Sequence, residues 1–415
     1  MTKALLPPPP IPAVPASAMI ATVARRYKVS PLRQFREMLS LKYRHKKVDF
    51  DEYYSQGIYR RDLSRAEKRE FIGMTANAVL NRRLSPGTRF VIRDTFRDKV
   101  ASAALYAREG LSHPRIQAVF GSAGAADDTA GPRKLADAPD VADFLSGGAE
   151  YPMFGKPAEG SGSAGSAMIL ACDAGRVTLG NGAEHDLKSF AAEVVADFPG
   201  GYLFQDLVEQ HPDLSRVAGR ALGTVRMVTV NDGSGPVLLY AVWKLPSPDA
   251  MSDNFWQEGS MLAPIDVSTG IATGCRRGVG PTAQDIAAHP VSGLAVVGLA
   301  MPDWAAARDL AQRAHAAFPE AGCLGWDMGL GAGGPVIIEC NTNPCLSEDS
   351  TLLKKLLPRM IDDAFKLTLD VVFPPPKVTG EQKDEKEEEV HATYPVDIWP
   401  DEKNLWEHIY TLKQL

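Results

Sequence analysis

Three oxygen-bearing side chains near residue 340 have the types and spacing of a metal site. Asp327 lies in one expected strand, and Glu339 and Asn341 stand two positions apart at the end of the next. Residues two apart share a face of a strand, and Asp327 joins them if the strands pair. Two carboxylates and an amide oxygen suit Mg²⁺, or Mn²⁺. The alternative is a solvated strand end, which the apolar run Val336–Ile338 makes less favourable.

A second candidate feature is Lys156 with the glycine-rich loop that follows it. The loop starts Gly160-Ser161-Gly162 and has the spacing GxGxxG, which alone is weak evidence. Ser166 stands where a P-loop needs lysine. Met168–Leu170 reads as a strand and not as the helix of a dinucleotide-binding fold. The remaining interpretation is a strand–loop–strand phosphate site, in which backbone N–H groups and Lys156 bind the anion. A surface loop without a ligand is the alternative.

Two basic side chains on neighbouring expected strands, Arg226 and Lys244, could neutralise a phosphoryl group during its transfer. Each taken alone is more often a surface charge. Asn254 follows in the next loop and could reach the same cleft, or be a simple turn residue. The histidines stand without a nucleophile pattern such as GxSxG, so hydrolase chemistry is not expected.

Length and composition exclude several classes of protein. At 415 residues the chain is long enough for two or three packed units, and its net charge of −6 gives no general reason to bind nucleic acid. Its five cysteines form no CxxC pair, so neither disulfides nor a zinc site are expected, and a reducing, cytoplasmic location follows. No apolar run is long enough to span a bilayer. Pro7–Pro10 interrupt the only apolar stretch of a signal-peptide kind.

The chain reads as a mixed order of helices and strands. Helices are expected at 17–41 with a break at Pro31, and at 64–80, 98–109, 137–145, 187–197, 303–317, 351–371 and 404–415. Strands are expected at 90–92, 113–120, 151–156, 168–172, 177–179, 201–208, 225–231, 237–244, 262–267, 324–328 and 336–339, the last two joined by a flexible Gly329–Gly334 turn. Hairpins interleaved with helices indicate the α+β class.

The segment from Arg25 to Lys47 is strongly basic, with Glu37 as its single acid. An ordinary solvated helix face is one interpretation. Peripheral contact with an anionic membrane surface or an anionic glycan is the other, because such contact needs no element that reads nucleic-acid bases.

Taken in order, these motifs resemble the ATP-grasp superfamily. Asp98-Lys99 resembles its first ATP-binding lysine, Lys156 its second, and Glu339-Cys340-Asn341 its metal strand. Further motifs resemble the sugar-transfer-associated branch: Gln210-His211-Pro212, Thr224–Thr229, Asp253-Asn254-Phe255 and Gly325-Trp326-Asp327. The resemblance covers about residues 90–358. Two departures are Lys244, where many relatives have arginine, and Gly259-Ser260, where a Gly-Gly pair is usual.

The resemblance implies an ATP-grasp fold, in which two α+β subdomains hold ATP between them, beside a helical basic N-terminal region. The expected units are a disordered Pro-rich tail (1–16), the N-terminal region (17–97), a first subdomain (98–208), a second subdomain (209–373), and a linker with a C-terminal tail (374–415). It also implies residue roles. Lys99, Lys156 and the loop residues Gly160, Ser161 and Gly162 would bind phosphates. Gln205, Asp206, Leu207 and Val208 would bind adenine, and Asp213 would bind ribose. Arg226, Lys244 and Asn254 would contact the group that is transferred, and Asp327, Glu339 and Asn341 would hold Mg²⁺.

The reaction implied is ATP-dependent ligation. A carboxylate is activated as an acyl phosphate and is then captured by an amine of an amino acid, a peptide or a sugar-linked acceptor. A kinase acting on a sugar or polyol hydroxyl is the first alternative, and a non-catalytic binding or scaffold protein is the second. The partners expected are therefore small molecules, with ATP and Mg²⁺ as cofactors.

Overall fold

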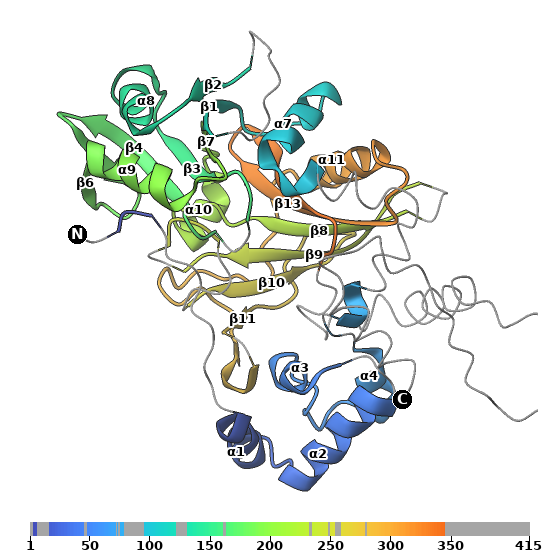
Figure 1. Ribbon diagram of the computed structural model, residues 1–415. Helices are drawn as coiled ribbons and strands as arrows, with labels where there is room; N and C mark the ends of the chain where they lie inside the picture. The colour runs from blue at the N-terminus through green and yellow to red at the C-terminus, as the bar shows by residue number, and fades with distance from the viewer. Residues whose placement is uncertain are drawn as a thin grey trace, which may run out of the picture.

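The computed structural model describes residues 3–5, 16–44, 48–71, 73, 75–78, 95–121, 131–160, 163–231, 235–247, 250–253, 259–278 and 280–344. Within this part, two seven-stranded sheets form the body of the protein, and a group of short helices lies beneath the second sheet (Figure 1). The expected strand at 90–92 and the expected helices at 351–371 and 404–415 lie outside the described residues. No described helix is both long and apolar enough to cross a membrane.

The first sheet has α8 (Ala138–Asp143) and α9 (Leu187–Asp197) on one face and contacts α7 (Lys99–Arg108) on the other, where Val100 packs against Leu203. Its strands in spatial order are β2 (Arg133–Leu135), β1 (Ile116–Phe120), β7 (Tyr202–Asp206), β3 (Met153–Pro157), β4 (Ala167–Asp173), β5 (Arg176–Leu179) and β6 (Glu184–Asp186). The helix α8, the π-turn η2 (Phe144–Gly148) and the helix α9 pack against Tyr202 and Phe204 in one core. Alternation therefore places Leu203 and Gln205 on the opposite face. Lys156 shares that face because it is the register partner of Leu203.

The second sheet is antiparallel throughout. Its strands in spatial order are β12 (Gln284–Asp285), β11 (Arg276–Arg277), β10 (Met261–Ile265), β9 (Val237–Leu245), β8 (Val225–Val230), β13 (Cys323–Gly331) and β14 (Gly334–Asn341). One face is packed with apolar side chains of these strands and of α11 (Trp304–Ala316) and α10 (Pro212–Ala218), including Met227, Trp243 and Trp326. The residues between them in the strands, Arg226, Lys244 and Asp327, therefore lie on the other face.

The N-terminal helices have a core of their own. They are α1 (Ala16–Arg26), α2 (Pro31–Leu39) with the π-turn η1 (Ser40–Arg44), α3 (Phe50–Ser55) and α4 (Arg65–Glu70). Buried aromatic rings, among them Tyr53, Tyr54 and Tyr59, hold these helices together. They reach the second sheet at the turn η3 (Gly280–Thr282), where Arg26 and Tyr27 donate hydrogen bonds to the Pro281 carbonyl (3.1 and 3.3 Å).

The structure confirms most of the expected elements and corrects three. The expected helix 64–80 is interrupted, because α4 ends at Glu70 and Phe71 takes extended backbone angles and is buried in the N-terminal core. The Gly329–Gly334 segment is not a flexible turn, since β13 continues to Gly331, which pairs with Gly334. The tail is not disordered throughout. Ala4 and Leu5 are buried, and their N–H groups donate to the Glu193 carboxylate of α9 (3.0 and 3.1 Å).

Candidate active site

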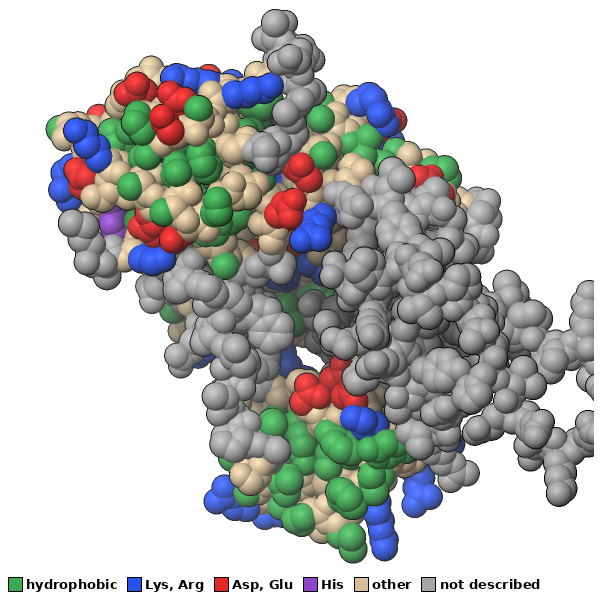
Figure 2. Space-filling view, in the orientation of Figure 1, with side chains coloured by type: hydrophobic (Ala, Val, Ile, Leu, Met, Phe, Trp, Pro, Cys, Tyr) green, Lys and Arg blue, Asp and Glu red, His purple; other side chains and the backbone are tan. Residues whose placement is uncertain are grey.

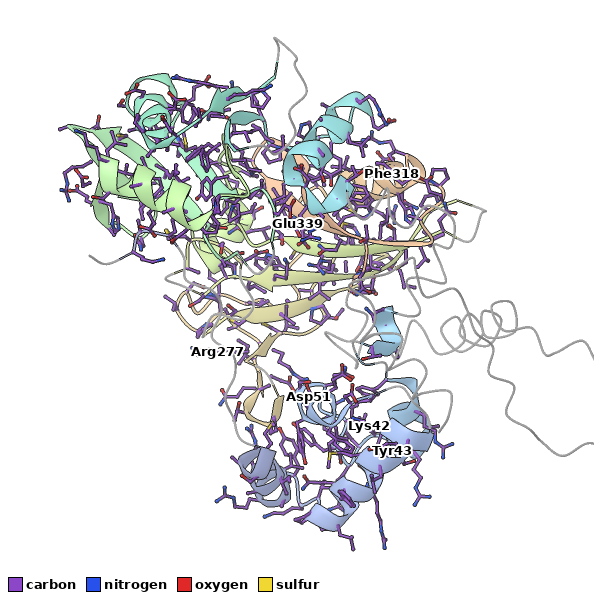
Figure 3. All side chains as sticks on the ribbon, in the orientation of Figure 1. Lys42, Tyr43, Asp51, Arg277, Phe318 and Glu339 are labelled. Atoms are coloured by element: carbon purple, nitrogen blue, oxygen red, sulfur yellow. The ribbon has the colours of Figure 1, made fainter. Side chains whose placement is uncertain are left out.

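A cleft lies between the helix α7, the strand β14 of the second sheet and the face of the first sheet that carries Lys156 and Gln205. Its lining comes from the helix α7 (Lys99–Arg108) and the residues around it, from β14, and from Lys156 and Gln205 of the first sheet. The empty space between them is about 350 Å³, including the part open to solvent. Figure 3 labels Glu339 in the middle of the body, where the two sheets come together. Residues far apart in the sequence thus meet at one place.

Two lysines enter the cleft with different environments. Lys99 follows the N-cap residue Asp98 of α7, and its ammonium donates to the Gly160 carbonyl of the glycine-rich loop (2.9 Å). Burial lowers the pKa of Lys99, and the nearby Glu339 carboxylate acts in the opposite direction. Lys156 is only 7% exposed. Burial, reinforced by the positive charge of Lys99, lowers the pKa of Lys156 to about 8.

Lys156 has no hydrogen bond or ion pair with any residue that the structure describes, and its largely buried side chain lines the cleft. A charge that has left most of its water needs a partner, since leaving water without one is costly. This environment is suited to an anion. Gly165 explains why the loop before β4 stays tight against the sheet: its φ is +78°, and a Cβ there would collide with the ring of Phe198.

The second group of charges surrounds Asp327 on the face of the second sheet that is opposite its apolar core. Arg226 is its register partner on β8 and binds both oxygens of the carboxylate through Nε and Nη2. Lys244 of β9 donates to the same carboxylate (3.1 Å). Burial by itself would raise the pKa of Asp327, but Arg226 and Lys244 outweigh it and hold the pKa well below the ordinary value. Asp327 is thus ionised and held by two cations.

Asp253 completes this network and was not among the residues predicted for the site. Its carboxylate lies 3.2 Å from the Lys244 ammonium and accepts hydrogen bonds from the N–H and hydroxyl groups of Thr224. Lys244 therefore sits between two carboxylates. The motif Asp253-Asn254-Phe255 carried the signal in the sequence, but only the fold shows that Asp253 reaches back to β8 and β9.

A β-bulge in β14 puts Glu339 beside Asp327. Asp327 pairs with Glu339, whereas the next residue of β13, Met328, pairs with Ile337, so Ile338 is the extra residue. Without the bulge, Glu339 would share the core-facing side with Ile337, which is 1% exposed. With the bulge, Glu339 and Asn341 share the face of Asp327. The sequence predicted that these three side chains gather, and the structure brings them together.

The residues expected to bind adenine, Gln205 to Val208, lie at the end of β7 and directly after it. Gln205 lines the cleft directly. The side chain of Asp206 points elsewhere, because it accepts hydrogen bonds from Arg115 (3.0 Å) and Gln117 (2.8 Å). The N–H groups of Asp206 and Leu207 donate to the carbonyls of Arg115 and Pro152 (2.9 and 3.4 Å). A ligand there would therefore have to use the other backbone groups of Asp206 and Val208, the two residues whose backbone is expected to bind adenine. Asp213 lies in the first turn of α10 and is paired with Arg216, and no contact joins it to the described lining of the cleft. Ser161, Gly162 and Asn254 lie outside the described residues.

Three side chains of the kind that binds Mg²⁺ share one face where β13 and β14 pair, although both oxygens of Asp327 accept from Arg226 and Lys244. Glu339 has no hydrogen bond or ion pair within the described residues. The buried atom of Asn341 that lacks a partner is its side-chain nitrogen, which is a hydrogen-bond donor and not a metal ligand. The described residues contain no group of three His, Cys, Asp or Glu side chains that could hold a metal ion. Two carboxylates and one amide are a small protein set, which suits Mg²⁺ because this ion keeps waters and phosphate oxygens among its ligands.

No curated protein matches this chain. Solved structures match at low identity. The L-amino acid ligase of Bacillus licheniformis is 12% identical over 65% of this chain and 48% of its own, with a TM-score of 0.35. D-alanine–D-alanine ligase of Bacillus anthracis is 14% identical over 67% of this chain and 68% of its own, with a TM-score of 0.36.

Phosphoribosylamine–glycine ligase of Thermotoga maritima is 12% identical over 66% of this chain and 56% of its own, with a TM-score of 0.36. The match spans about half the length of the L-amino acid ligase, and these similarities carry no conclusion about activity. The family comparison is stronger, since the pattern of the sugar-transfer associated ATP-grasp family matches residues 76–360, more than half of the chain. This protein belongs to the sugar-transfer associated ATP-grasp family.

Proposed function

We propose that the protein is an ATP-dependent ligase that activates a carboxylate as an acyl phosphate for attack by an amine. The observation that carries the proposal is the largely buried Lys156 side chain, which lacks a counter-ion among the described residues and lines the same cleft as Lys99 and Glu339. A polyphosphate supplies the missing negative charge. Gln205 and the backbone of Asp206–Val208 at the rim would bind the adenine ring.

The charges around Asp327 suit phosphoryl transfer, which depends on positioning and neutralisation more than on covalent groups. In the proposed reaction an oxygen of the substrate carboxylate attacks the γ-phosphorus, and the bond to the departing ADP breaks. Arg226 and Lys244 would neutralise the transferring group and the acyl phosphate. Asp327, Glu339 and Asn341 would hold Mg²⁺, which supplies charge stabilisation at the phosphate oxygens when bound. The amine then attacks the acyl carbon, and inorganic phosphate leaves.

The test uses the full-length protein with ATP, Mg²⁺ and a panel of amino acids, hydroxy acids and amino sugars. ADP release is followed, and hydroxylamine is added in place of the amine. A ligase gives a hydroxamate with one of the acids, identified by mass. ADP release without a trappable acyl product contradicts the ligase proposal. A stable phosphorylated hydroxyl, seen by phosphorus NMR, instead supports the kinase.

A further inference from the structure

The helix α2 and its π-turn η1 carry apolar side chains on two opposite sides. Met38 and Leu41 are buried in the core of the N-terminal helices, beside the buried Gln34, whose amide donates to the Val29 carbonyl. On the other side Leu32, Phe35 and Tyr43 are exposed by 60%, 52% and 43%. At about 100° per residue the directions of these three side chains spread over about 80°, so they lie on one broad side of the helix and its π-turn. Two large apolar side chains more than half exposed on one short helix are unusual for a surface that faces only water.

The stripe continues onto α3. Phe50, 37% exposed, meets Tyr43 edge to face with ring centroids 6.4 Å apart. The ammonium of Lys42 lies 4.7 Å from the centroid of the Phe50 ring. We call the four side chains Leu32, Phe35, Tyr43 and Phe50 the outer apolar face. In Figure 2, hydrophobic side chains gather on the N-terminal helices below the body, with Lys and Arg side chains mainly at the lower edges and a group of Asp and Glu side chains at the upper edge.

The surroundings of the outer apolar face are basic. The exposed charged residues of α1, α2 and the turn between them that lie nearest in sequence are Arg25, Arg26, Lys28, Arg33 and Arg36. Glu37 is the only acid from Arg25 to Lys47, and its carboxylate is turned inward. It accepts from Lys68 (2.6 Å) and Tyr53 (2.7 Å), as well as from Arg33. Arg33 is therefore paired with Glu37, and Lys42 with Asp49 (2.9 Å each). Arg25, Lys28 and Arg36 have no ion pair among the described residues, so these three carry the positive charge of the rim.

We propose that the outer apolar face is a docking surface for an anionic lipid bilayer, with α2 lying in the plane of the membrane surface. An amphipathic helix binds there by burying apolar side chains at the headgroup boundary, while Lys and Arg contact anionic headgroups. A glycan would use the basic rim but would leave Leu32 and Phe35 without a partner. A second copy of the chain would bring two basic rims together, which repel. An anionic bilayer can bury the apolar stripe and can also pair its headgroups with the basic rim.

The experiment measures sedimentation of the full-length protein with vesicles of phosphatidylcholine alone and of phosphatidylcholine with phosphatidylglycerol. The wild type should bind the anionic vesicles, and less as salt is raised. L32Q/F35Q should weaken that binding about tenfold or more, because two buried apolar contacts are lost. R25Q/K28Q/R36Q should weaken it similarly and remove most of the salt dependence. All substituted side chains are exposed, so the thermal midpoint should stay unchanged.

The matched control is V291Q/L294Q. Val291 and Leu294 are exposed by 71% and 45%, on the segment between β12 and α11, where residues 286–300 contain no Lys or Arg. This variant should bind vesicles like the wild type. Equal binding to neutral and anionic vesicles, or wild-type binding by L32Q/F35Q, overturns the proposal. The proposal is also overturned if the wild type does not bind vesicles but forms a dimer that becomes monomeric in L32Q/F35Q. None of these outcomes depends on ATP turnover, so they leave the proposed ligase activity to its own test.

Discussion

Asp327 and Glu339 are opposite each other in the β13–β14 pair but differ in what they contact. Asp327 is bound by Arg226 and Lys244, whereas Glu339 has no hydrogen bond or ion pair among the described residues. Substitutions at these two positions should therefore act on different properties. Changes at Glu339 should affect chemistry, and changes around Asp327 should also affect stability.

Replacing Glu339 with Gln should reduce ATP turnover about a hundredfold or more, since a carboxylate proposed to bind the metal loses its charge. The midpoint of urea unfolding should fall only slightly, because Glu339 has no hydrogen bond or ion pair among the described residues and acts on Lys99 and Lys156 through its charge alone. ADP release as a function of Mg²⁺ concentration checks the first expectation. Glu209→Gln, at an exposed residue after β7, is the control. If E339Q turned over ATP at the wild-type rate, Glu339 would have no role in the reaction.

Arg226→Met should lower the free energy of unfolding by about 3–5 kcal/mol, because it leaves Asp327 buried with one partner fewer. Urea denaturation at neutral pH measures the change. Arg216→Met is a matched control: its pair with Asp213 is exposed, so the expected change is below about 1 kcal/mol. If the two substitutions cost the same, the Asp327 network does not stabilise the fold as described.

The pKa of about 8 for Lys156 predicts how nucleotide affinity depends on pH. Below pH 8 the free protein carries a charged Lys156 and binds phosphate well. As pH rises through about 8 the amine loses its proton, and kcat/KM for ATP should fall. Lys156→Arg should flatten this part of the profile, since arginine keeps its charge. A profile that is the same in wild type and K156R would mean that Lys156 does not titrate in this range.

At the scale of elements, α11 is fastened to the second sheet by a buried histidine. His315 is fully buried, and its two ring nitrogens lie 2.7 Å from the Thr229 hydroxyl and 2.6 Å from the Ala321 carbonyl. Trp326 of β13 donates to the same Thr229 hydroxyl (2.9 Å). Helix, β8 and β13 therefore share one polar contact inside an apolar core.

This contact predicts an acid-sensitive stability. Burial lowers the pKa of His315 below its ordinary 6.5, although the Ala321 carbonyl acts in the opposite direction. The unfolded chain therefore takes up a proton on this ring at a higher pH than the folded protein does. The stability that the neutral ring contributes is present above pH 6.5 and is lost as pH falls below it. Urea unfolding at pH 5 and 7.5 should show this loss, and His315→Gln should reduce the difference between the two pH values.

At the scale of the whole molecule, the N-terminal region contacts the residues that directly follow β14. Asn77, 1% exposed, donates to the Asn343 side chain and the Pro344 carbonyl (3.0 Å each), directly after Asn341. The N-terminal region thus contacts the second sheet both here and at η3.

Asn77→Ala should loosen this junction, since it leaves buried acceptors without their donor at a cost of about 1–3 kcal/mol. Hydrogen–deuterium exchange should become faster at residues 75–78 and 340–344 and stay unchanged in β3–β5. Asn181→Ala, at an exposed turn of the first sheet, should leave both regions as they are. Unchanged exchange in N77A would mean that the junction is held by other contacts.

The sequence by itself determined the elements and the chemistry of the residues they carry. Apolar periodicity and turn residues located α9 and the strands around Lys156 and Glu339, because these signals are local. It also determined that oxygen ligands and cations stand at strand ends. The motif order identified the family.

The tertiary structure alone decided how these residues combine. Arg226 and Asp327 are 101 positions apart, and only the β8–β13 register makes them a pair. The bulge at Ile338 turns Glu339 to the side of Asp327, and alternation in the sequence does not reveal it. The network of Asp253 and the exposure of Leu32 and Phe35 depend likewise on which surfaces pack together. Local pattern sets what an element is, whereas long-range packing sets what each side chain meets.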